Sequence, residues 1–451
     1  VFLSAGTYNI TGLITFQNKN SVTLRGAGPG QTILHMTGNS AITSGQTPDY
    51  LAVEHFITGG NTKGSTSITV DNATGIRSGS FLNIYQADDP DFYWSRSNDT
   101  DNTGQLVMVT AVNGNILTLE DPLIWTFNLN PRFKAQAVGG MRWSGIENLT
   151  INADSSYLGT MIQFWSSYAS WIKNVELTGG MGNSMVSIYR SLRMEIRDSY
   201  LHDTFSTTDG YGILTFFGSS SDRAGATGTL IENNIFKGLW YAIVLETEVG
   251  SVIDYNYMVG NKFAGWPNYQ VPDINANHGA HGMMQLFEGN VSVGIQNDGY
   301  HGSTSHVTLF RNWFSGQHAD VNRTGNVKTI SLERFSYYHN VVGNVLGFPG
   351  WPRTTTGRYE MTGMPAYTAQ SVIYRLGYPN VGNNGYSLTN PPSNAGAGGL
   401  DPKVASTLMR WGNYDYQNNA AKWDPSEIPS DVPVPANQIL PASLFYSARP
   451  S

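Results

Sequence analysis

IENNIFKGLWYAIVLETEVGSVIDYNYM, residues 231–258, begins and ends with the same six-residue pattern. In each copy an apolar residue is followed by two variable positions, an asparagine, and two residues that end on an apolar side chain. Related copies are IENLTI at 146, IKNVEL at 172, IRDSYL at 196, LFRNWF at 309 and YYHNVV at 337. A pattern that returns at such intervals predicts a solenoid in which each copy belongs to one coil.

The asparagine of this pattern is predicted to be structural. Asn234, Asn256, Asn312 and Asn340 share the fourth position, and Ser199 stands in the equivalent place. The gap between Asn256 and Asn312 is longer than the others, and it fits two coils or one coil with a long excursion. In a parallel solenoid, such side chains stack at one turn and hydrogen-bond to neighbouring backbone, while alternate apolar residues fill the interior.

Short apolar runs between the asparagine positions predict a second parallel sheet. These runs are MIQFW, MVSIY, GILTFF, AIVLE, MMQLF and TISLE. Treating them as equivalent strands aligns Phe216, Glu246, Phe287 and Glu333, with Glu288 adjacent. Equivalent residues of neighbouring coils stack about 4.8 Å apart, so we expect Glu246, Glu288 and Glu333 on one sheet. A slip of one residue would turn each side chain to the other face.

The first forty residues carry a resemblance to a known family. VFLSAGTYNI at residues 1–10 and VTLRGAGPGQTIL at residues 22–34 are similar to the first coil of right-handed parallel β-helix proteins of the pectin-lyase-like superfamily. The resemblance implies an all-β, right-handed parallel β-helix. It also implies action on a long glycan bound along one sheet, since the superfamily includes polysaccharide lyases, glycoside hydrolases and phage tailspikes. The catalytic motifs of polygalacturonases and pectate lyases are not present as such.

The whole chain, 1–451, is predicted to be one β-helix domain with two additions. Residues 56–138 change in texture to hairpin-like segments around turns such as Asn113-Gly114, which predicts a small β-rich insertion between early coils. Residues 347–451 are rich in Pro, Asn and Gly, which predicts long loops and a C-terminal segment that caps or flanks the solenoid.

The amino-acid composition excludes some classes of binding partner. The chain has 26 Lys and Arg against 33 Asp and Glu, and no cysteine. Without a basic cluster we expect no nucleic-acid partner, and without a long apolar run we expect no membrane partner. The composition suits a secreted bacterial protein whose export signal lies upstream of this sequence. We expect a polysaccharide or oligosaccharide as the partner, and the sequence leaves the oligomeric state open.

The stretch 278–312 gathers most of the candidate chemistry. Glycoside hydrolysis needs one carboxyl group as proton donor and a second to act on water or on the anomeric carbon. Glu288, directly after an apolar run, and Asp298, in a glycine-flanked turn, are the first candidates for this pair. Glu246 is the next candidate, and His301 is placed to orient Asp298 or bind a hydroxyl. The competing interpretation is that both carboxylates only cap strands and turns.

Further residues are predicted to bind substrate. Aromatic rings stack on sugars, and cationic or imidazole groups bind hydroxyl or carboxylate groups. The candidates are His278, His281, Tyr300, Trp240, Arg311, Glu333, Trp351 and Arg353.

No metal or other cofactor is expected. His278, His281 and His301 lack the helical spacing that would support a transition-metal site. The acidic loop after residue 87 was weighed as a Ca²⁺ site, but it lacks EF-hand spacing and is interpreted as solvated. Its carboxylates are Asp88, Asp89, Asp91, Asp99 and Asp101.

Three functions remain open at this point. A secreted glycoside hydrolase using Glu and Asp is favoured by the surplus carboxylates and by the 12% aromatic content. A polysaccharide lyase would need a uronate, with Arg311, Arg334 or Arg353 as the cation and His281 or His301 as the base. A non-catalytic, tailspike-like glycan-binding protein would use the same charged stretch as a binding patch.

Overall fold

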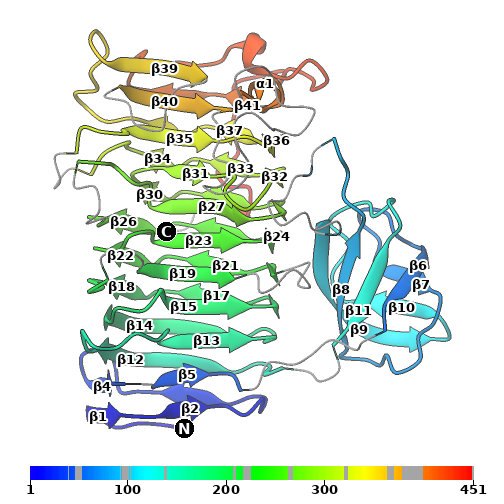
Figure 1. Cartoon of the computed structure of the whole chain (residues 1–451). Coiled ribbons are helices and arrows are strands. Elements are labelled where there is room, and N and C mark those ends of the chain that lie inside the picture. Colours follow the sequence, from blue (N-terminus) through cyan, green and yellow to red (C-terminus); the bar gives the residue numbers. More distant parts are fainter. Residues whose placement is uncertain are drawn as a thin grey trace.

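A computed structural model describes most of the chain. It leaves out residues 39, 46–52, 92, 94–100, 102, 137–139, 207–209, 217–224, 263–267, 319–322, 363–369, 378–399 and 449–451. The described residues form a tall solenoid of short parallel strands, with a small barrel at its side (Figure 1). The predicted all-β, right-handed parallel β-helix is confirmed.

Three sheets make up the solenoid, and each coil contributes strands to them in turn. Sheet A has 20 strands: β1 (Gly6–Ile10), β3 (Thr23–Arg25), β4 (Thr32–Met36), β12 (Gly145–Ala153), β14 (Trp171–Gly179), β17 (Glu195–Arg197), β18 (Tyr200–His202), β21 (Leu230–Glu232), β22 (Ile235–Lys237), β25 (Val252–Asp254), β26 (Tyr257–Val259), β29 (Leu286–Glu288), β30 (Val291–Ser292), β33 (Thr308–Phe310), β34 (Trp313–Phe314), β37 (Asn340–Val342), β38 (Val345–Leu346), β41 (Met409–Trp411), β42 (Asn413–Asp415) and β43 (Ala420–Lys422).

The other two sheets are smaller. Sheet B has 11 strands: β2 (Leu13–Thr15), β5 (Ala41–Thr43), β13 (Ile162–Trp165), β15 (Ser184–Tyr189), β19 (Tyr211–Phe216), β23 (Ile243–Glu246), β27 (Ile274–Gly279), β31 (Ile295–Asn297), β35 (Lys328–Leu332), β40 (Ser371–Leu376) and β39 (Gly357–Thr362). Sheet C has six: β16 (Ser191–Leu192), β20 (Ala226–Thr227), β24 (Glu248–Val249), β28 (Gly282–Met283), β32 (Thr304–Ser305) and β36 (Ser336–Tyr337).

Stacked aliphatic side chains form the core. Along sheet B the strands pair so that one inward position is aliphatic in seven coils in succession and aromatic in the eighth: Ile162, Val186, Ile213, Ile243, Ile274, Ile295, Ile330 and Tyr374. All of them are fully buried. Burying each such side chain stabilises the fold by about 1.5–3 kcal/mol, and the alternation of strands sends the residues on either side to the outer face.

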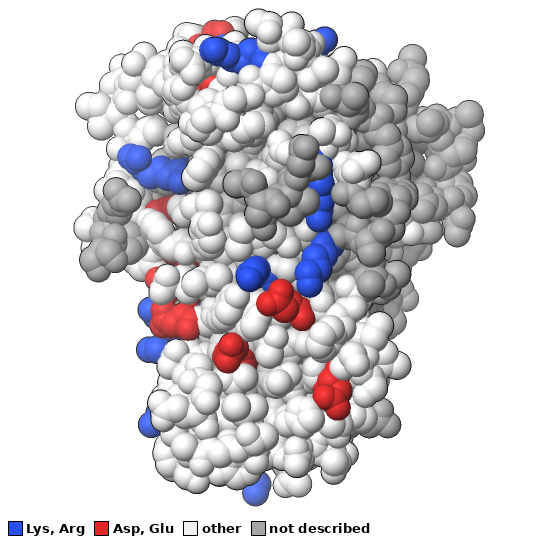
Figure 2. Space-filling view, turned by 90° about the vertical axis from the view of Figure 1, so that its left-hand side faces the viewer, with Lys and Arg blue, Asp and Glu red and all other residues white. Residues whose placement is uncertain are grey.

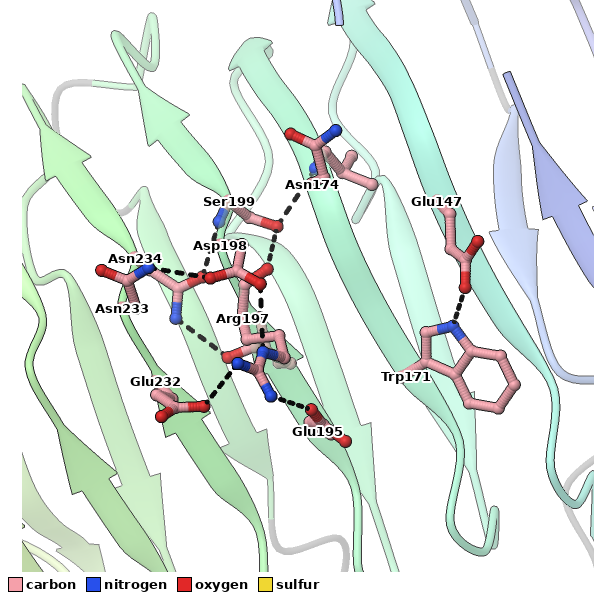
Figure 3. A network of polar contacts seen from close by, with 12 residues as sticks. Glu147, Trp171, Asn174, Glu195, Arg197, Asp198, Ser199, Glu232, Asn233 and Asn234 are labelled. Atoms are coloured by element: carbon pink, nitrogen blue, oxygen red, sulfur yellow. Dashed lines mark hydrogen bonds and ion pairs between the residues drawn. The ribbon is translucent and has the colours of Figure 1, made fainter. Parts of the chain in front are cut away.

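An asparagine ladder links the coils between the two halves of sheet A. Each backbone N–H donates to the side-chain oxygen of the next member, at 2.9–3.1 Å. Each asparagine Nδ2 donates to a backbone carbonyl of the preceding coil, for example Asn234 to Ile196 (Figure 3). The members are Ser199, Asn234, Asn256, Asn290, Asn312, Asn344 and Asn413.

The ladder corrects one predicted member and adds others. Asn340 was expected in it, but Asn340 begins β37 and pairs with Thr308. Asn344 takes the place, because the equivalent of Leu309 in that coil is Val341 rather than Tyr337. Asn290 divides the long gap between Asn256 and Asn312, so this interval holds two coils.

The predicted alignment of the second sheet was wrong in one coil. The run MMQLF belongs to β28 and β29, which lie in sheets C and A, and not to sheet B. The sheet B strand of that coil is β27, with the polar sequence INANHG. Glu288 therefore lies on a different sheet from Glu246 and Glu333. A strand with asparagines in place of aliphatic residues has little of the alternation that identifies a strand in a sequence. For this reason the sequence pattern did not predict β27.

Six antiparallel strands form a closed barrel between β5 and β12, in the stretch predicted to be an insertion. They are β6 (His55–Gly59), β7 (Ser67–Val70), β8 (Phe81–Gln86), β9 (Thr103–Asn113), β10 (Ile116–Leu119) and β11 (Arg132–Ala135). The barrel has a core of its own. It docks on sheet C through a shared apolar cluster that includes Leu106 and Leu192, and Leu106 N donates to Thr227 Oγ1 at 3.0 Å.

The last hundred residues add coils and then turn back. Strands β39 to β42 continue sheets B and A, and two short helices, α1 (Pro402–Ser406) and η2 (Pro425–Glu427), accompany them. Residues 440–446, here called the C-terminal strap, then run back to the middle of the solenoid (Figure 1). None of the helices in the described ranges combines the length and the apolar character that a membrane crossing needs.

The side of the solenoid that carries β18, β22, β26 and β30 has few charges. Figure 2 shows this side as mostly uncharged surface, with acidic and basic side chains near one another. One outward column there consists of apolar side chains, among them Ile235, Tyr257 and Trp313, all at least 40% exposed. Charge on this side is therefore balanced locally and does not form a patch of a single sign.

Candidate functional site

Four ionisable residues form a column along the C-terminal ends of four neighbouring strands of sheet B. Asn277 pairs with Asn297 and Asn297 pairs with Leu332, so the residues that follow them, His278, Asp298 and Glu333, occupy successive coils. Glu246 pairs with Gly279 and precedes His278 in the column. Parallel strands lie about 4.8 Å apart, and the repeat therefore brings together carboxyl groups from distant parts of the sequence.

His278 and Asp298 form an ion pair at the centre of this column. His278 Nδ1 lies 2.7 Å from Asp298 Oδ2, and the two side chains are 24% and 7% exposed. Asn275 Nδ2 donates to the same Asp298 oxygen at 2.7 Å, and Tyr300 N donates to Oδ1 at 2.9 Å. With three donors around it, the Asp298 carboxylate is held in one orientation.

The pair shifts the pKa of both partners. Burial alone would lower the pKa of His278, but the charge and hydrogen bond of Asp298, with a contribution from Glu246, raise it to about 9. Burial alone would raise the pKa of Asp298, but the charge and hydrogen bond of His278 lower it, helped by Tyr300 and Asn275. At neutral pH the site thus contains an imidazolium and a carboxylate.

Glu333, the next carboxyl group, has the opposite shift. Burial raises its pKa to about 7, and the negative charge of Asp298 acts in the same direction, although Arg375 and Lys328 oppose it. Arg375 forms an ion pair with Glu333 and donates from Nε to Ser331 Oγ at 2.9 Å. Near neutral pH a substantial fraction of Glu333 is therefore protonated beside an ionised Asp298.

A buried lysine lies in the same cluster. Lys328 Nζ donates to Gln296 Oε1 at 3.2 Å, and Gln296 Nε2 donates to the Tyr241 hydroxyl at 3.0 Å. Burial lowers the pKa of Lys328 well below its usual value. The nearby Arg375 acts in the same direction, against Glu333 and Asp298. A lysine in such surroundings is a base rather than a fixed cation.

Two groups of aromatic rings belong to the surroundings of the column. Trp240 lies 5.4 Å from Tyr241 and 5.5 Å from Tyr211, measured between ring centroids, and the Tyr241 hydroxyl accepts from Gln296. Tyr300 stacks on His278 at 5.5 Å, and His301 meets the His278 ring edge-on at 4.8 Å. Aromatic rings near the carboxyl groups are suited to stack on sugar units.

The structure thus brings together seven of the predicted site residues: Glu246, His278, Asp298, Tyr300, His301, Glu333 and Trp240. Asn275, Gln296, Lys328, Arg375 and Tyr241 also belong to the cluster, and they were missed in the sequence. The only sequence signal for them is the unusual polarity of INANHG and of GIQND beside apolar strands.

Glu288 does not pair with Asp298, contrary to the prediction. Glu288 is on β29 of sheet A, in register with Asp254 of β25, which is in register with Glu232 of β21. These three carboxyl groups form a second column, and the C-terminal strap covers it. Leu444 N donates to Glu288 Oε2 at 2.9 Å, and the Tyr446 hydroxyl donates to Glu232.

The carboxyl groups of this second column influence one another. Burial raises the pKa of Asp254 to about 7, and Glu232 and Glu288 act in the same direction, while Tyr446 and Arg197 oppose them. Arg197 is shared among acidic groups, at 3.0 Å from Glu195 and 3.2 Å from Glu232 (Figure 3). The second column is thus closed off by the chain itself.

The remaining predicted residues lie away from the sheet B cluster or inside the fold. His281 is fully buried between the hydroxyls of Ser303 and Ser305, at 2.8 Å from each. Burial lowers its pKa to about 3, so it is neutral. Arg311 donates to the backbone oxygens of Leu440 and Pro441 and so holds the strap.

The loop that carries Trp351 and Arg353 follows β38. Trp351 was predicted to stack on a sugar, but its ring is 5% exposed within the main core, and its Nε1 donates to Gln417 at 3.1 Å. Arg353 is exposed on the same loop. The burial of Trp351 explains why Gly347 and Gly316 pack closely against its ring.

The acidic loop is only partly described. Asp99 lies outside the described residues. Asp101 forms an ion pair with Arg132, and Asp89 accepts from the backbone of Asp91. In the described ranges, no group of three or more His, Asp or Glu side chains is arranged to hold a metal ion.

The chain resembles known proteins in its fold but not in its sequence. No protein-family model and no curated protein sequence matches the chain. The tailspike protein gp49 of Pseudomonas phage LKA1 aligns with 76% of this chain at 13% identity and a TM-score of 0.54. The chain is a parallel β-helix protein. This β-helix protein spans only 54% of the length of the tailspike.

Two other solved structures align with lower scores. PfbA, a surface adhesin of Streptococcus pneumoniae, aligns over 83% of the β-helix protein and 78% of its own chain, at 14% identity and a TM-score of 0.41. The A-module of the mannuronan C-5 epimerase AlgE4 from Azotobacter vinelandii aligns over 83% and 85%, at 12% identity and a TM-score of 0.32.

Proposed function

We propose that this protein is a secreted glycoside hydrolase that cleaves a polysaccharide lying along sheet B. The observation that carries the proposal is the neighbouring pair Asp298 and Glu333, which occupy successive coils and whose pKa values move in opposite directions. Two carboxyl groups kept in different protonation states are what acid and nucleophile or base require.

In the proposed reaction, protonated Glu333 donates its proton to the glycosidic oxygen while the Asp298 carboxylate attacks the anomeric carbon. The bond to the leaving sugar breaks, and a glycosyl ester forms on Asp298. Water then hydrolyses this ester with Glu333 as base. A separation of one strand spacing, about 4.8 Å, is nearer to the roughly 5 Å of retaining enzymes than to the wider gap of inverting ones.

The surroundings support these roles. His278 and Asn275 hold Asp298 at 2.7 Å each, which fixes the carboxylate that would attack. Trp240, which contacts Tyr241, and Tyr300, which stacks on His278, are proposed to stack on the sugars flanking the scissile bond. Because Glu333 must be protonated, we expect turnover to decline as pH rises above about 7.

The proposal is tested with a panel of neutral and acidic polysaccharides. New reducing ends and the ultraviolet absorbance of an unsaturated uronate are both measured on each digest. Hydrolysis gives reducing ends without absorbance. Asp298→Asn should then abolish turnover, and Glu195→Gln, a partly exposed carboxylate on sheet A, should not. If Asp298→Asn kept full turnover, the cluster around Asp298 would not be the catalytic site.

A polysaccharide lyase is the second candidate, and one observation favours it. Lys328 is a buried amine with a lowered pKa beside Arg375, which supplies a base next to a cation that would neutralise a uronate. Absorbance together with reducing ends would select the lyase, and Lys328→Met would then remove both signals. If neither signal appears with any polysaccharide of the panel but some polysaccharides bind, the result would support a glycan-binding protein instead.

A further inference from the structure

A pocket of about 470 Å³ lies where the barrel meets the first coils of the solenoid. Its volume is within the range of small-molecule sites. The barrel contributes Gly75, Arg77, Ser78, Gly79, Ser80, Phe81 and Gln136, and the solenoid side contributes Asn18, Asn20, Gly140 and Arg142. None of these residues belongs to the sheet B cluster or to the strap, so the pocket is a separate feature.

The pocket has two guanidinium groups and no carboxylate in its lining. Arg142 lies over the Phe81 ring, at 4.9 Å from the centroid, and donates to Gly79 O. A Cβ on Gly79 would lie 2.9 Å from Arg142 Nη1, so glycine permits this close approach. Burial lowers the pKa of Arg142, and the positive charge of Arg77 acts in the same direction.

Arg77 carries the second positive charge. It is exposed at the mouth of the pocket, and its guanidinium makes no hydrogen bond or ion pair with any residue in the described part of the chain. Glu120 also influences Arg142, but both of its oxygens accept from the Tyr168 hydroxyl outside the pocket. Two like charges that face one shared space without an anion between them favour binding of an anion.

The side-chain amide of Gln136 is a second, independent observation that points to a ligand. Its side chain is 7% exposed and lines the pocket, yet neither its Nε2 nor its Oε1 has a hydrogen-bond partner among the described residues. The Asn18 Oδ1 is also buried and has no hydrogen-bond partner in the part of the chain that the structure describes. A buried amide with both ends unsatisfied is rare and calls for a partner, and a hydroxyl group supplies both a donor and an acceptor.

We propose that this pocket binds a sugar unit that carries an oxyanion, namely a sulfate, phosphate or carboxylate. The oxyanion would accept from Arg77 and Arg142, and the sugar hydroxyls would satisfy Gln136 and Asn18. The site is additional to the proposed active site and does not depend on its chemistry. It would fasten an acidic glycan to the barrel, away from sheet B.

Calorimetric titration of the whole chain with glucose 6-sulfate, glucose 6-phosphate and glucuronate tests the proposal, with uncharged glucose as reference. We expect the charged sugars to bind and glucose not to bind measurably. Arg77→Ala should weaken binding about tenfold or more, as expected for losing a charge-assisted hydrogen bond. Gln136→Leu should weaken the charged sugars but not inorganic sulfate, and Arg358→Ala, an exposed arginine on β39, should change nothing.

Three results would overturn the proposal in whole or in part. Absence of binding by every charged sugar, or unchanged binding in Arg77→Ala, would reject the site. Inorganic sulfate or phosphate binding as tightly as the charged sugars would reject the sugar and leave a free-oxyanion site. Arg77→Ala changes an exposed side chain, so its result is not confounded by misfolding.

Discussion

The two columns of carboxyl groups on this solenoid arise from the same repeat, yet they are opposite in character. On sheet B, Asp298 and Glu333 lie among His278, Lys328 and Arg375 and beside aromatic rings. On sheet A, Glu232, Asp254 and Glu288 are covered by the C-terminal strap. The coil repeat places like groups one strand apart in both regions.

The comparison teaches that stacking alone does not make a site. Stacked carboxyl groups repel one another, and each column resolves the repulsion differently. On sheet B, the neighbouring His278 lowers the pKa of Asp298, whereas burial raises the pKa of Glu333 against the opposing charges of Arg375 and Lys328. On sheet A, burial raises the pKa of Asp254 to about 7, and the strap covers the column. The column with interleaved charges is suited to proton transfer, and the covered column is suited to fastening the chain.

The largest expected difference between the columns is in catalysis. Glu333→Gln should lower kcat by about 10²- to 10⁴-fold, as for loss of a general acid. Glu288→Gln should leave kcat unchanged, because that carboxyl group bonds to Tyr255 and to the strap. Steady-state kinetics on the cleaved polysaccharide gives both values. If Glu288→Gln lowered kcat as much as Glu333→Gln, the two columns would not differ in their role in catalysis.

Asp254→Asn should stabilise the protein at high pH. The pKa of Asp254 is about 7 in the folded state and about 3.9 when unfolded, so wild-type stability is lost as pH rises between these values. Asparagine has no such loss, and above pH 7 we expect the free energy of unfolding to rise by roughly 2–4 kcal/mol.

Urea denaturation at about pH 4 and about pH 8 measures this gain, with the exposed Asp431→Asn as a matched control. The gain should be present at the higher pH and absent at the lower. An equal effect at both pH values would mean that Asp254 is ionised under the strap.

His278→Gln should have the opposite pH dependence. The pKa of His278 is about 9 when folded and about 6.5 when unfolded. Its charge therefore stabilises the wild type fully below about 6.5, and this contribution is lost as pH rises through about 9. We expect the substitution to cost about 2 kcal/mol at pH 6 and much less above pH 9.

The same denaturation series detects this effect. Asp298 has a lowered pKa, so its share of the ion pair is lost only under acidic conditions, when pH falls through its folded value. In the double variant His278→Gln with Asp298→Asn the pH-dependent part should disappear. If it persists, the titrating group is not this pair.

The smallest expected effect is that of Tyr446→Phe. It removes the hydroxyl that donates to Glu232 and should lower the free energy of unfolding by about 1–2 kcal/mol. Because Leu444 and Tyr446 of the strap bond to carboxyl groups of sheet A, kcat should stay the same. Thermal unfolding and kinetics on one preparation give both numbers, and Tyr414→Phe, on the outer face of β42, is the matched control. A fall in kcat in Tyr446→Phe would show that the strap influences the sheet B cluster.

The fold followed from the sequence because its strongest signals are periodic. The apolar columns and most of the asparagine ladder were predicted from spacing, as Asn234 and Asn256 show. The exchange of Asn340 for Asn344 came from a shift of the repeat in one coil, where Tyr337 was mistaken for the equivalent of Leu309.

The site was harder to predict because its strand departs from the pattern. INANHG holds Asn275 and His278, but without aliphatic alternation it was not assigned to sheet B, and MMQLF was placed there instead. This error placed Glu288 on one sheet with Glu246 and Glu333. Arg375 and Lys328 join the cluster only through the stacking of coils more than 30 residues apart, and no local pattern records such contacts.

The strap also sets an order for the making of the protein. Leu444 reaches back 156 residues to Glu288, and Tyr446 reaches back 214 residues to Glu232. A chain that emerges from the ribosome N-terminus first can stack its coils as they appear, but the strap cannot cover the sheet A column until residues 444–446 have been made. A solvent-exposed Asp254 is ionised at neutral pH. Closure of the strap therefore favours uptake of a proton by Asp254, whose pKa is about 7 in the folded state.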